Sequence, residues 1–359
     1  MSMKQYEFDQ RIEKVQHYYG NTLVDKRDLA TNVCTVEEQP SNTIKSTLAK
    51  IHPKVQMRFY GCGIPFPPLL EGATVLDLGC GGGRDCFVLS SLVGELGSVI
   101  GIDATPEQIA FAQSYIDHHR EAFGYAKSNV SFLQGHIEEL DKLNLPPESV
   151  DVIVSNCVIN LSMTKADVLA DMAKLLKPGG EIYFADIFAD RRLAPDLKQD
   201  ALIVGECIGD ALYFEDFIHL ARQAGFLDVR VTAKTLKTIS NPIIEAKLRG
   251  ARLYSITLRL FKMDLEGSCE DYGQVAIYKG NFPEAPDRFM LDIGHYFETG
   301  RAVPVCRNTA DMIKKSRYSV LFDVIGEGLR HYGSFQCGTY QQPVFSIESS
   351  ASDRASCGC

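Results

Sequence analysis

The chain has 359 residues, of which 45% are hydrophobic and 23% charged, and its formal net charge is −9. This acidic balance argues against nucleic acid as the main partner, because phosphate binding needs a basic surface. No apolar run is long enough to span a bilayer, and the polar segment 1–20 lacks the apolar region of a signal peptide. The cysteines are scattered along the chain, which disfavours a structural disulfide framework and favours a cytoplasmic protein with metalloid or redox chemistry.

Short, nearly continuous apolar runs alternate with amphipathic stretches from Thr74 onward, and this alternation predicts a doubly wound α/β sheet. We expect strands over 74–78, 98–103, 130–134, 150–155 and 181–187, with helices over 84–93, 106–123 and 165–175. Thr105 before Pro106 is a typical helix start. A helix over 214–224 and an antiparallel pair of strands near 229–233 and 254–261 would complete a seven-stranded sheet.

The remaining segments suggest further units, as a chain of this length usually has more than one domain. The stretch 234–252 contains Pro242 and a helical pattern, and we interpret it as an insertion. Short strands broken by Gly and Pro, at 274–278, 289–291 and 296–298, predict a small, mostly β C-terminal module. We therefore divide the chain into a cover segment (1–73), a nucleotide-binding core (74–190), a segment completing the sheet (191–264), the module (265–345) and a mobile tail (346–359).

A glycine-rich loop joins the first expected strand to the first helix, and residues 75–85 read Val-Leu-Asp-Leu-Gly-Cys-Gly-Gly-Gly-Arg-Asp. Such glycines let the backbone approach a ligand at the carboxyl edge of the sheet. The loop alone also fits a nicotinamide enzyme. Asp77 discriminates, because its carboxylate would repel a pyrophosphate but can hold the amino group of a methionine moiety. A second acid, Asp103, ends the second strand, where it can accept hydrogen bonds from ribose hydroxyls.

These two acids around the loop resemble the class I S-adenosylmethionine methyltransferases, which have a Rossmann-like fold, and the resemblance covers 74–187. It implies that the cofactor binds along the ends of the first four strands. The implied residues are Asp77, Gly79 and Gly81 at the methionine end, Asp103, Ala104 and Gln108 at the ribose and adenine, His136 and Ile137 beside the adenine, and Asn156 near the transferred methyl group.

Three cysteines outside the loop lie in unusual surroundings. Cys62 belongs to a Tyr-Gly-Cys-Gly turn, Cys157 to Ser-Asn-Cys-Val-Ile-Asn after the fourth strand, and Cys207 to Gly-Glu-Cys-Ile-Gly. Taken singly, each is more often an inert structural thiol. Soft thiolates, however, select soft centres over hard cations. Three of them would bind trivalent arsenic as a pyramid and leave its lone pair free as a nucleophile, so that no general base is needed.

Together these motifs resemble the arsenite methyltransferase family, and residues 270–280 and 297–300 resemble its C-terminal region. The resemblance implies methyl transfer from S-adenosylmethionine to arsenite bound by Cys62, Cys157 and Cys207, giving mono- and dimethylated arsenicals, which is arsenic detoxification. The arsenic site would then draw on the segment 191–264. Cys34 is implied to act with Cys62 through a disulfide that forms during turnover and is reduced by thioredoxin or glutathione. Tyr60 is implied to cover the cofactor, and we expect a monomer.

Two alternatives remain open. A methyltransferase acting on a small organic carbon, oxygen or nitrogen centre would use these cysteines only structurally. A non-catalytic arsenic- or zinc-binding protein would bind metalloid without cofactor, and the intact Asp77 loop argues against it.

The other cysteines carry weaker expectations. Cys80 and Cys86 are expected to pack as small residues, and the tail cysteines Cys357 and Cys359 could deliver arsenic. The remaining ones are Cys269, Cys306 and Cys337. A zinc site among them is not favoured, because the chain has no CxxC pair and its histidines do not recur at ligand spacing.

Overall fold

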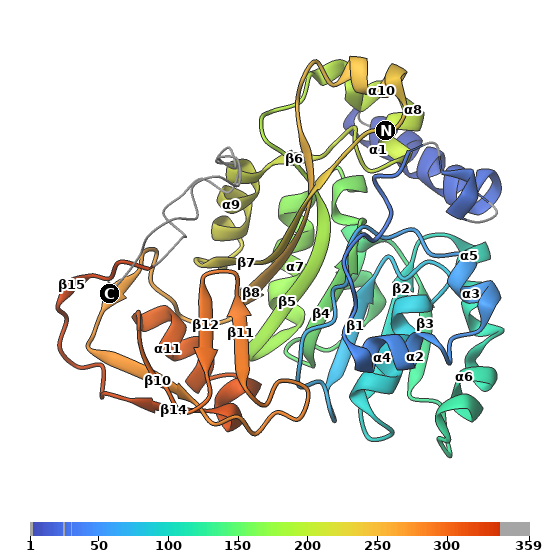
Figure 1. Ribbon diagram of the computed structural model, residues 1–359. Helices are drawn as coiled ribbons and strands as arrows, with labels where there is room; N and C mark the ends of the chain where they lie inside the picture. The colour runs from blue at the N-terminus through green and yellow to red at the C-terminus, as the bar shows by residue number, and fades with distance from the viewer. Residues whose placement is uncertain (1–2, 24–25, 30, 338–359) are drawn as a thin grey trace.

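The central sheet has the strand order β3-β2-β1-β4-β5-β8-β7, with the short β6 paired to β5 (Figure 1). The structure, a computed structural model, describes residues 3–23, 26–29 and 31–337. Strands β1 to β5 run parallel, whereas β8 is antiparallel to both β5 and β7. The bounds are Thr74–Leu78 (β1), Ser98–Asp103 (β2), Val130–Gln134 (β3), Val150–Asn156 (β4), Leu176–Ala189 (β5), Leu212–Tyr213 (β6), Val229–Lys237 (β7) and Leu253–Phe261 (β8). The predicted doubly wound sheet of seven strands, closed by an antiparallel pair, is confirmed.

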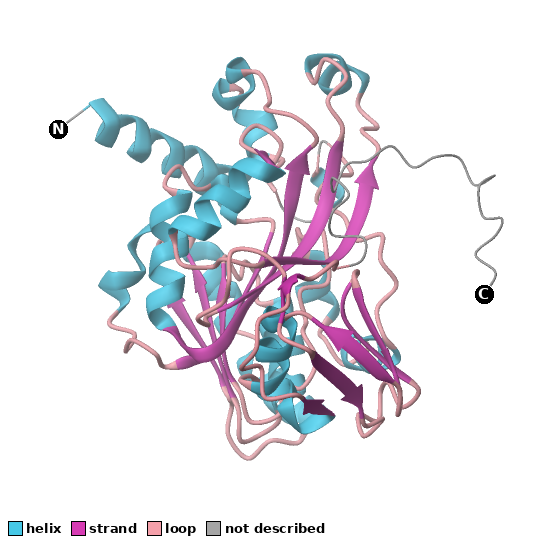
Figure 2. Cartoon of the chain, turned by 90° about the vertical axis from the view of Figure 1, so that its left-hand side faces the viewer, coloured by secondary structure: helices cyan, strands magenta, loops and turns pink. Residues whose placement is uncertain are grey.

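Helices cover both faces of this sheet, and β8 is buried at every position. On one face, α7 (Lys165–Leu175) and α9 (Phe214–Gln223) pack side chains such as Met172 and Phe217 into the larger hydrophobic core. The other face is covered by α2 (Asn42–Leu48), α3 (Pro53–Met57), α4 (Arg84–Val93), α5 (Pro106–Gln113) and α6 (Ile116–Phe123). Figure 2 shows the two helical layers from the side.

The stretch 106–123 forms two helices, α5 and α6, where a single helix was expected. Ser114 ends α5, and its hydroxyl donates a hydrogen bond to the carbonyl oxygen of Phe111 at 2.6 Å. A serine hydroxyl that bonds to nearby backbone in this way competes with regular helix geometry. His119 is buried, because α6 turns this side chain onto the ring of Phe87, 3.7 Å away between ring centroids.

The N-terminal segment and the region after β5 lie together beyond the carboxyl ends of the parallel strands (Figure 1). Arg11 in α1 (Met3–His17) forms an ion pair with Asp210 at 3.3 Å, just after α8 (Ala201–Gly205). The other elements of this region are η1 (Tyr18–Thr22), η2 (Lys26–Asp28), η5 (Pro195–Gln199) and α10 (Pro242–Lys247). Two short helices, η3 (Ile137–Leu143) and η4 (Ile159–Leu161), follow β3 and β4. Within the described residues, none of the helices combines the length and apolarity needed to cross a membrane.

The C-terminal module has its own hydrophobic core, which includes Tyr278, Phe289 and Phe322. Its strands form a three-stranded sheet, β13-β10-β14, and two pairs, β11-β12 and β15-β9. The bounds are Glu270–Asp271 (β9), Gln274–Tyr278 (β10), Arg288–Asp292 (β11), His295–Glu298 (β12), Ala302–Val305 (β13), Phe322–Ile325 (β14) and Gly333–Ser334 (β15), with η6 at Arg317–Leu321. The sequence did not predict one helix of this module, α11 (Arg307–Lys314), because its 8 residues make only about two turns, too few for a helical pattern to stand out.

A buried charge network joins this module to the sheet. The carboxylate of Glu181 in β5 lies 2.8 Å from the Nε of Arg259 in β8, and both side chains are buried. From the module, the Tyr318 hydroxyl donates to Glu181 at 3.0 Å, and Arg317 forms an ion pair with the same carboxylate. The module is therefore anchored near the amino end of the sheet, because Glu181 lies opposite the last residue of β8.

Candidate active site

The glycine-rich loop follows β1 in the conformation that its glycines allow. Gly79 and Gly81 have φ values of 72° and 51°, in the left-handed region that favours glycine. A Cβ on Gly79 would collide with the side chain of Val158, whereas a Cβ on Gly81 would point into open space. The loop therefore packs against the end of β4 at Gly79 and leaves room for a ligand at Gly81.

This room is part of a cavity with an empty volume of about 880 Å³ at the carboxyl ends of β1, β2 and β4. Most residues predicted to bind the cofactor line it, namely Tyr60, Gly79, Gly81, Asp103, Ala104, His136, Ile137 and Asn156. The structure thus brings together loop, strand-end and cover residues that are far apart in the sequence.

Asp103 is oriented by two backbone hydrogen bonds. Its Oδ2 accepts the N–H of Gly81 and its Oδ1 accepts the N–H of Thr105, both at 2.8 Å. Each carboxylate oxygen has a further lone pair available. Asp103 can therefore fix the loop and still accept hydrogen bonds from vicinal hydroxyls in the cavity.

Asp77 lies beside the main cavity, in a smaller one that it shares with Tyr60, Gly79 and Asn156. The carboxylate is buried and accepts a hydrogen bond from the Cys86 thiol at 3.1 Å. Burial, followed by the charge of nearby Asp85, raises the pKa of Asp77 to about 8. The charge of Arg84, which lines the same smaller cavity, lowers this pKa without offsetting burial and Asp85, so a positively charged ligand amine would further favour the ionised form.

Gln108 is the predicted cofactor residue that the structure turns away from the cavity. Its side-chain amide donates instead to the carbonyl oxygen of Tyr19 at 2.8 Å, and Gln16 likewise donates to the carbonyl oxygen of Ala104 at 2.8 Å. These bonds hold the N-terminal segment over the cavity, and Tyr19 contacts Tyr60 edge to face. The sequence did not predict Gln16 and Tyr19 as lining residues, because no local pattern marks a helix end that packs on a distant strand.

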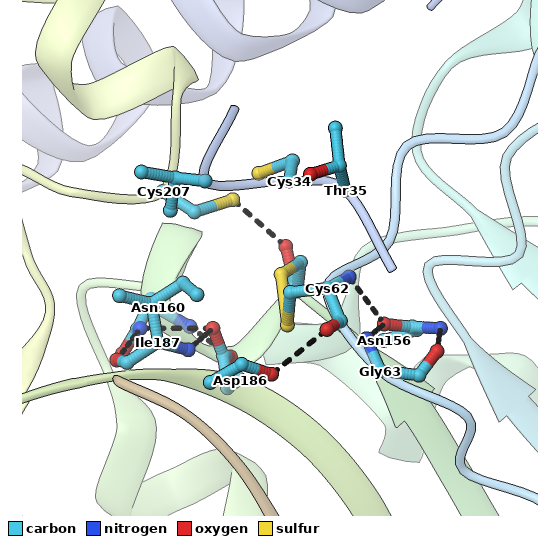
Figure 3. The surroundings of a disulfide bond; sticks show 12 residues. Cys34, Thr35, Cys62, Gly63, Asn156, Asn160, Asp186, Ile187 and Cys207 are labelled. Atoms are coloured by element: carbon cyan, nitrogen blue, oxygen red, sulfur yellow. Dashed lines mark hydrogen bonds between the residues drawn. A yellow bond between two sulfur atoms is a disulfide. The ribbon is translucent and has the colours of Figure 1, made fainter. Parts of the chain in front are cut away.

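Four buried cysteines meet beside this cavity (Figure 3). The sulfur atoms of Cys34, Cys157 and Cys207 lie within 4.8 Å of one another, and Cys62 is joined to Cys157 by a disulfide. Their surroundings are apolar, with Val33, Ile203 and Ile208 among them. Since Cys157 also lines the cavity, a ligand held by these sulfurs would lie next to a ligand in the cavity.

The disulfide differs from the pairing that the family resemblance implied, because Cys62 bonds to Cys157 and Cys34 is free. Asn156 provides the physical reason, as its Oδ1 accepts the N–H of Cys62 at 2.9 Å and so holds this residue beside Cys157. The Nδ2 of Asn156 donates to the carbonyl oxygen of Gly63 and to Asp85, each at 3.0 Å. A single amide thus aligns the Cys62 turn with the end of β4.

Two of these cysteines have strained backbones. Cys157 and Cys207 have φ values of 61° and 60°, which residues with a side chain rarely adopt. Such strain costs about 1–3 kcal/mol per residue and is commonly found at functional sites. The Cys207 thiol donates to the carbonyl oxygen of Cys157 at 3.0 Å, so the two strained residues support each other.

A buried carboxylate, Glu206, ties the N-terminal segment to the cysteines. It accepts hydrogen bonds from the Tyr18 hydroxyl and the Thr31 hydroxyl, both at 2.5 Å, and from the Thr31 N–H at 3.0 Å. The pKa of Cys34 is raised well above its ordinary value, first by its hydrogen bond to Cys207, then by burial and by the charges of Cys207 and Glu206. The closed site therefore favours the protonated thiol at Cys34.

Comparisons with known proteins agree with this arrangement. Residues 69–239 match a family model described as a methyltransferase domain, and residues 272–351 match one described as the arsenite methyltransferase C-terminal domain.

Relatives with the same description span nearly the whole chain. The arsenite methyltransferase of Aquipseudomonas alcaligenes is 51% identical over 328 residues, covering 91% of this chain and 94% of that protein. The arsenite methyltransferase of Homo sapiens is 41% identical over 325 residues, covering 89% and 86%. The crystal structure of an arsenic (III) S-adenosylmethionine methyltransferase from Chlamydomonas reinhardtii, 44% identical, superposes with a TM-score of 0.80 and covers 83% of this chain and all of that one. The chain thus belongs to the arsenite methyltransferase family.

Proposed function

We propose that this protein transfers methyl groups from S-adenosylmethionine to thiol-bound arsenite, giving mono- and dimethylated arsenicals in arsenic detoxification. The observation that carries the proposal is the position of Cys157, which lines the cofactor cavity and belongs to the cluster of buried cysteines. A methyl acceptor on this cluster therefore lies beside a methyl donor in the cavity.

The cavity residues fit S-adenosylmethionine, whose sulfonium supplies an electrophilic methyl group. Asp77 would face the amino group of its methionine part, since this buried carboxylate needs a cation to ionise near neutral pH. Asp103 would hold the ribose hydroxyls, and Gly81 leaves the space that the ligand requires. His136 and Ile137 would flank the adenine, while Tyr60 and Tyr19 would close the cavity from the N-terminal side.

The cysteines would position arsenic by binding it as thiolates. Cys34, Cys157 and Cys207 are the sulfurs that lie within 4.8 Å of one another, and Cys62 joins them through its disulfide to Cys157. We propose Cys62, Cys157 and Cys207 as the ligands during transfer, with Cys34 completing the redox step. Because the arsenic lone pair attacks and carries no proton, orientation of the two reactants is the main requirement.

The redox step follows from the electron count. Donation of the arsenic lone pair to a methyl cation raises arsenic from the trivalent to the pentavalent state. Two electrons must return before the next transfer, and two thiolates supply them when they join as a disulfide. Two thiols of glutathione or thioredoxin then reduce this disulfide by exchange, taking the oxidised form themselves. The pairing of Cys62 with Cys157 in the structure supports such a step.

The test is incubation of the purified protein with arsenite, S-adenosylmethionine and glutathione or thioredoxin with its reductase, followed by arsenic speciation. We expect methylated arsenic that stops after a limited turnover when the reductant is left out. Unchanged arsenite, with cofactor binding shown separately, would instead favour a methyltransferase for a small organic acceptor, whose activity would survive Cys→Ser changes.

Several properties of the whole chain complete the proposal. A reductant-dependent cycle suits a cytoplasmic enzyme, because thiol reductants are maintained there.

The module core is distinct from the sheet core, which supports a unit beginning near residue 265, after the core (74–190) and the segment 191–264. We propose that the protein acts as a monomer. The tail cysteines Cys357 and Cys359, proposed for arsenic delivery, lie outside the described residues.

A further inference from the structure

Three cysteines that the proposed reaction does not use form a second cluster in the C-terminal module. The sulfur atoms of Cys269, Cys306 and Cys337 all lie within 4.8 Å of one another. All three are free, with Cys306 and Cys337 buried and Cys269 half-buried. Within the described part of the chain, no further Cys, His, Asp or Glu belongs to this group.

The fold holds these three residues in place from separate segments. Cys269 precedes β9 and Cys337 follows β15, and these strands pair antiparallel. The pairing continues beyond the strands, because the N–H of Phe335 donates to the carbonyl oxygen of Cys269 at 2.8 Å. Cys306 approaches from the N-cap of α11. The cluster is thus built by tertiary structure, with its sulfurs gathered before any ligand arrives.

The surroundings of Cys306 favour a thiolate. Its sulfur accepts the backbone N–H of Thr309 at 3.5 Å, at the N-terminus of α11, and a guanidinium N–H of Arg230 at 4.0 Å. A helix N-terminus and a nearby arginine are the environments that stabilise negative sulfur, and the thiolate is the form that binds soft ions.

We propose that Cys269, Cys306 and Cys337 bind trivalent arsenic at a second, non-catalytic site. Structural zinc takes four ligands, whereas three sulfurs match the pyramidal geometry of trivalent arsenic. Binding exchanges the three As–O bonds of arsenous acid for As–S bonds. The three hydroxides leave as water with two thiol protons and one proton from solvent, so no oxidant is required. The choice of arsenic among thiophilic ions rests on the proposed function, but the three-sulfur arrangement does not.

The second site cannot serve methyl transfer directly. Arg230, which contacts Cys306, lies near the first residue of β7 and opposite the last residues of β8. This is the amino-end edge of the parallel strands, whereas the cofactor cavity lies at their carboxyl ends. Arsenic bound here would therefore be stored, and its binding would stabilise the module.

The experiment uses full-length protein in which Cys157, Cys207, Cys357 and Cys359 are all replaced by Ser, so that only the second cluster can supply three thiols. The protein is reduced with a phosphine, incubated with arsenite and freed of excess. Arsenic and zinc are measured by mass spectrometry, and sulfur ligands are counted by arsenic X-ray absorption. We expect about one arsenic per chain with three As–S bonds, and a higher thermal unfolding midpoint.

Adding Cys306→Ser should reduce the retained arsenic to nearly none. Serine remains a good N-cap, so this change removes the sulfur and preserves the start of α11. Cys269→Ser, at a half-buried position, should cause the same loss, whereas Cys86→Ser, a buried cysteine outside both clusters, should not. No retained arsenic, arsenic insensitive to both cluster variants, or zinc held in its place would overturn the proposal. Since the background protein lacks Cys157 and Cys207, these outcomes are independent of whether the wild-type protein methylates arsenite.

Discussion

The thiol of Cys207 donates to the backbone carbonyl of Cys157 at 3.0 Å, and both residues adopt left-handed backbone conformations. This contact joins the end of β4 to the region after α8, segments that meet only in the folded protein. It places two sulfurs side by side at the rim of the cofactor cavity, and it makes these two cysteines the centre of the proposed arsenic site.

The first prediction concerns the division of roles among the four cysteines. Cys157→Ser or Cys207→Ser should abolish methylation of arsenite and of monomethylated arsenic, by at least about 100-fold, since ligands that act as a unit are not additive. Cys34→Ser or Cys62→Ser should spare methylation of trivalent monomethylated arsenic, which needs only two thiols. Product speciation measures both, with cofactor binding by each variant as the control. Loss of activity toward both substrates in all four variants would contradict this division.

The second prediction is proton release on cofactor binding. The pKa of Asp77, about 8 in the cofactor-free fold, lies above the ordinary aspartate value, so the folded chain holds an extra proton between these pH values. Stability of the cofactor-free protein therefore falls as the pH rises from about 4 through 8. A bound ammonium group favours the ionised carboxylate, so S-adenosylmethionine binding at pH 7 should release close to one proton.

Calorimetry in two buffers with different ionisation enthalpies measures this release. The internal control is the same titration at about pH 9.5, where Asp77 is already ionised and no proton should leave. Equal binding heats in both buffers at pH 7 would show that Asp77 does not meet the ammonium group.

The third prediction is that the folded protein loses stability in acid because of His119. Burial is the main reason that its pKa is lowered to about 4. The unfolded chain takes up a proton near pH 6.5 and the folded chain does not, so stability is lost as the pH falls from 6.5 through 4. The full difference corresponds to about 3 kcal/mol. Urea unfolding at pH 7 and pH 4.5 should show this loss in the wild type and in His118→Gln, an exposed neighbour, and a smaller loss in His119→Gln.

The fourth prediction concerns the attachment of the C-terminal module. Glu181→Gln leaves Arg259 buried without its charge partner, which should cost about 3–5 kcal/mol of unfolding free energy. The matched control is Glu298→Gln, which removes an exposed pair with Arg301 and should change stability by less than about 1 kcal/mol. Urea unfolding and limited proteolysis near residue 265 report the two effects. If both variants unfold alike, the network does not anchor the module.

Local patterns predicted the sheet and the cofactor loop well, because buried parallel strands and glycine turns are encoded in consecutive residues. The strand bounds of β1, β2 and β3 agree with the sequence, and Gly79, Asp103 and Asn156 line one cavity as expected. What the sequence did not predict depends on contacts between distant segments. Examples are the burial of His119 on Phe87 and the turn of Gln108 toward Tyr19.

The cysteines show the same dependence on contacts between distant segments. Motifs identified Cys62, Cys157 and Cys207 individually, but the partner of Cys62 depends on the amide of Asn156 and cannot be inferred from spacing. Cys269, Cys306 and Cys337 are too widely separated to form a recognisable metal motif, and the β9–β15 pairing brings two of them together. Tertiary pairing creates such sites without leaving a local pattern.

The buried carboxylate of Glu206 links closure of the N-terminal segment to arsenic binding. Its hydrogen bonds hold the N-terminal segment closed over the site, and its negative charge lies close to the sulfurs of Cys34 and Cys207. Deprotonated sulfurs would repel this carboxylate and loosen the segment, whereas arsenic bound by three thiolates forms a neutral complex. Closure and arsenic capture should therefore reinforce each other.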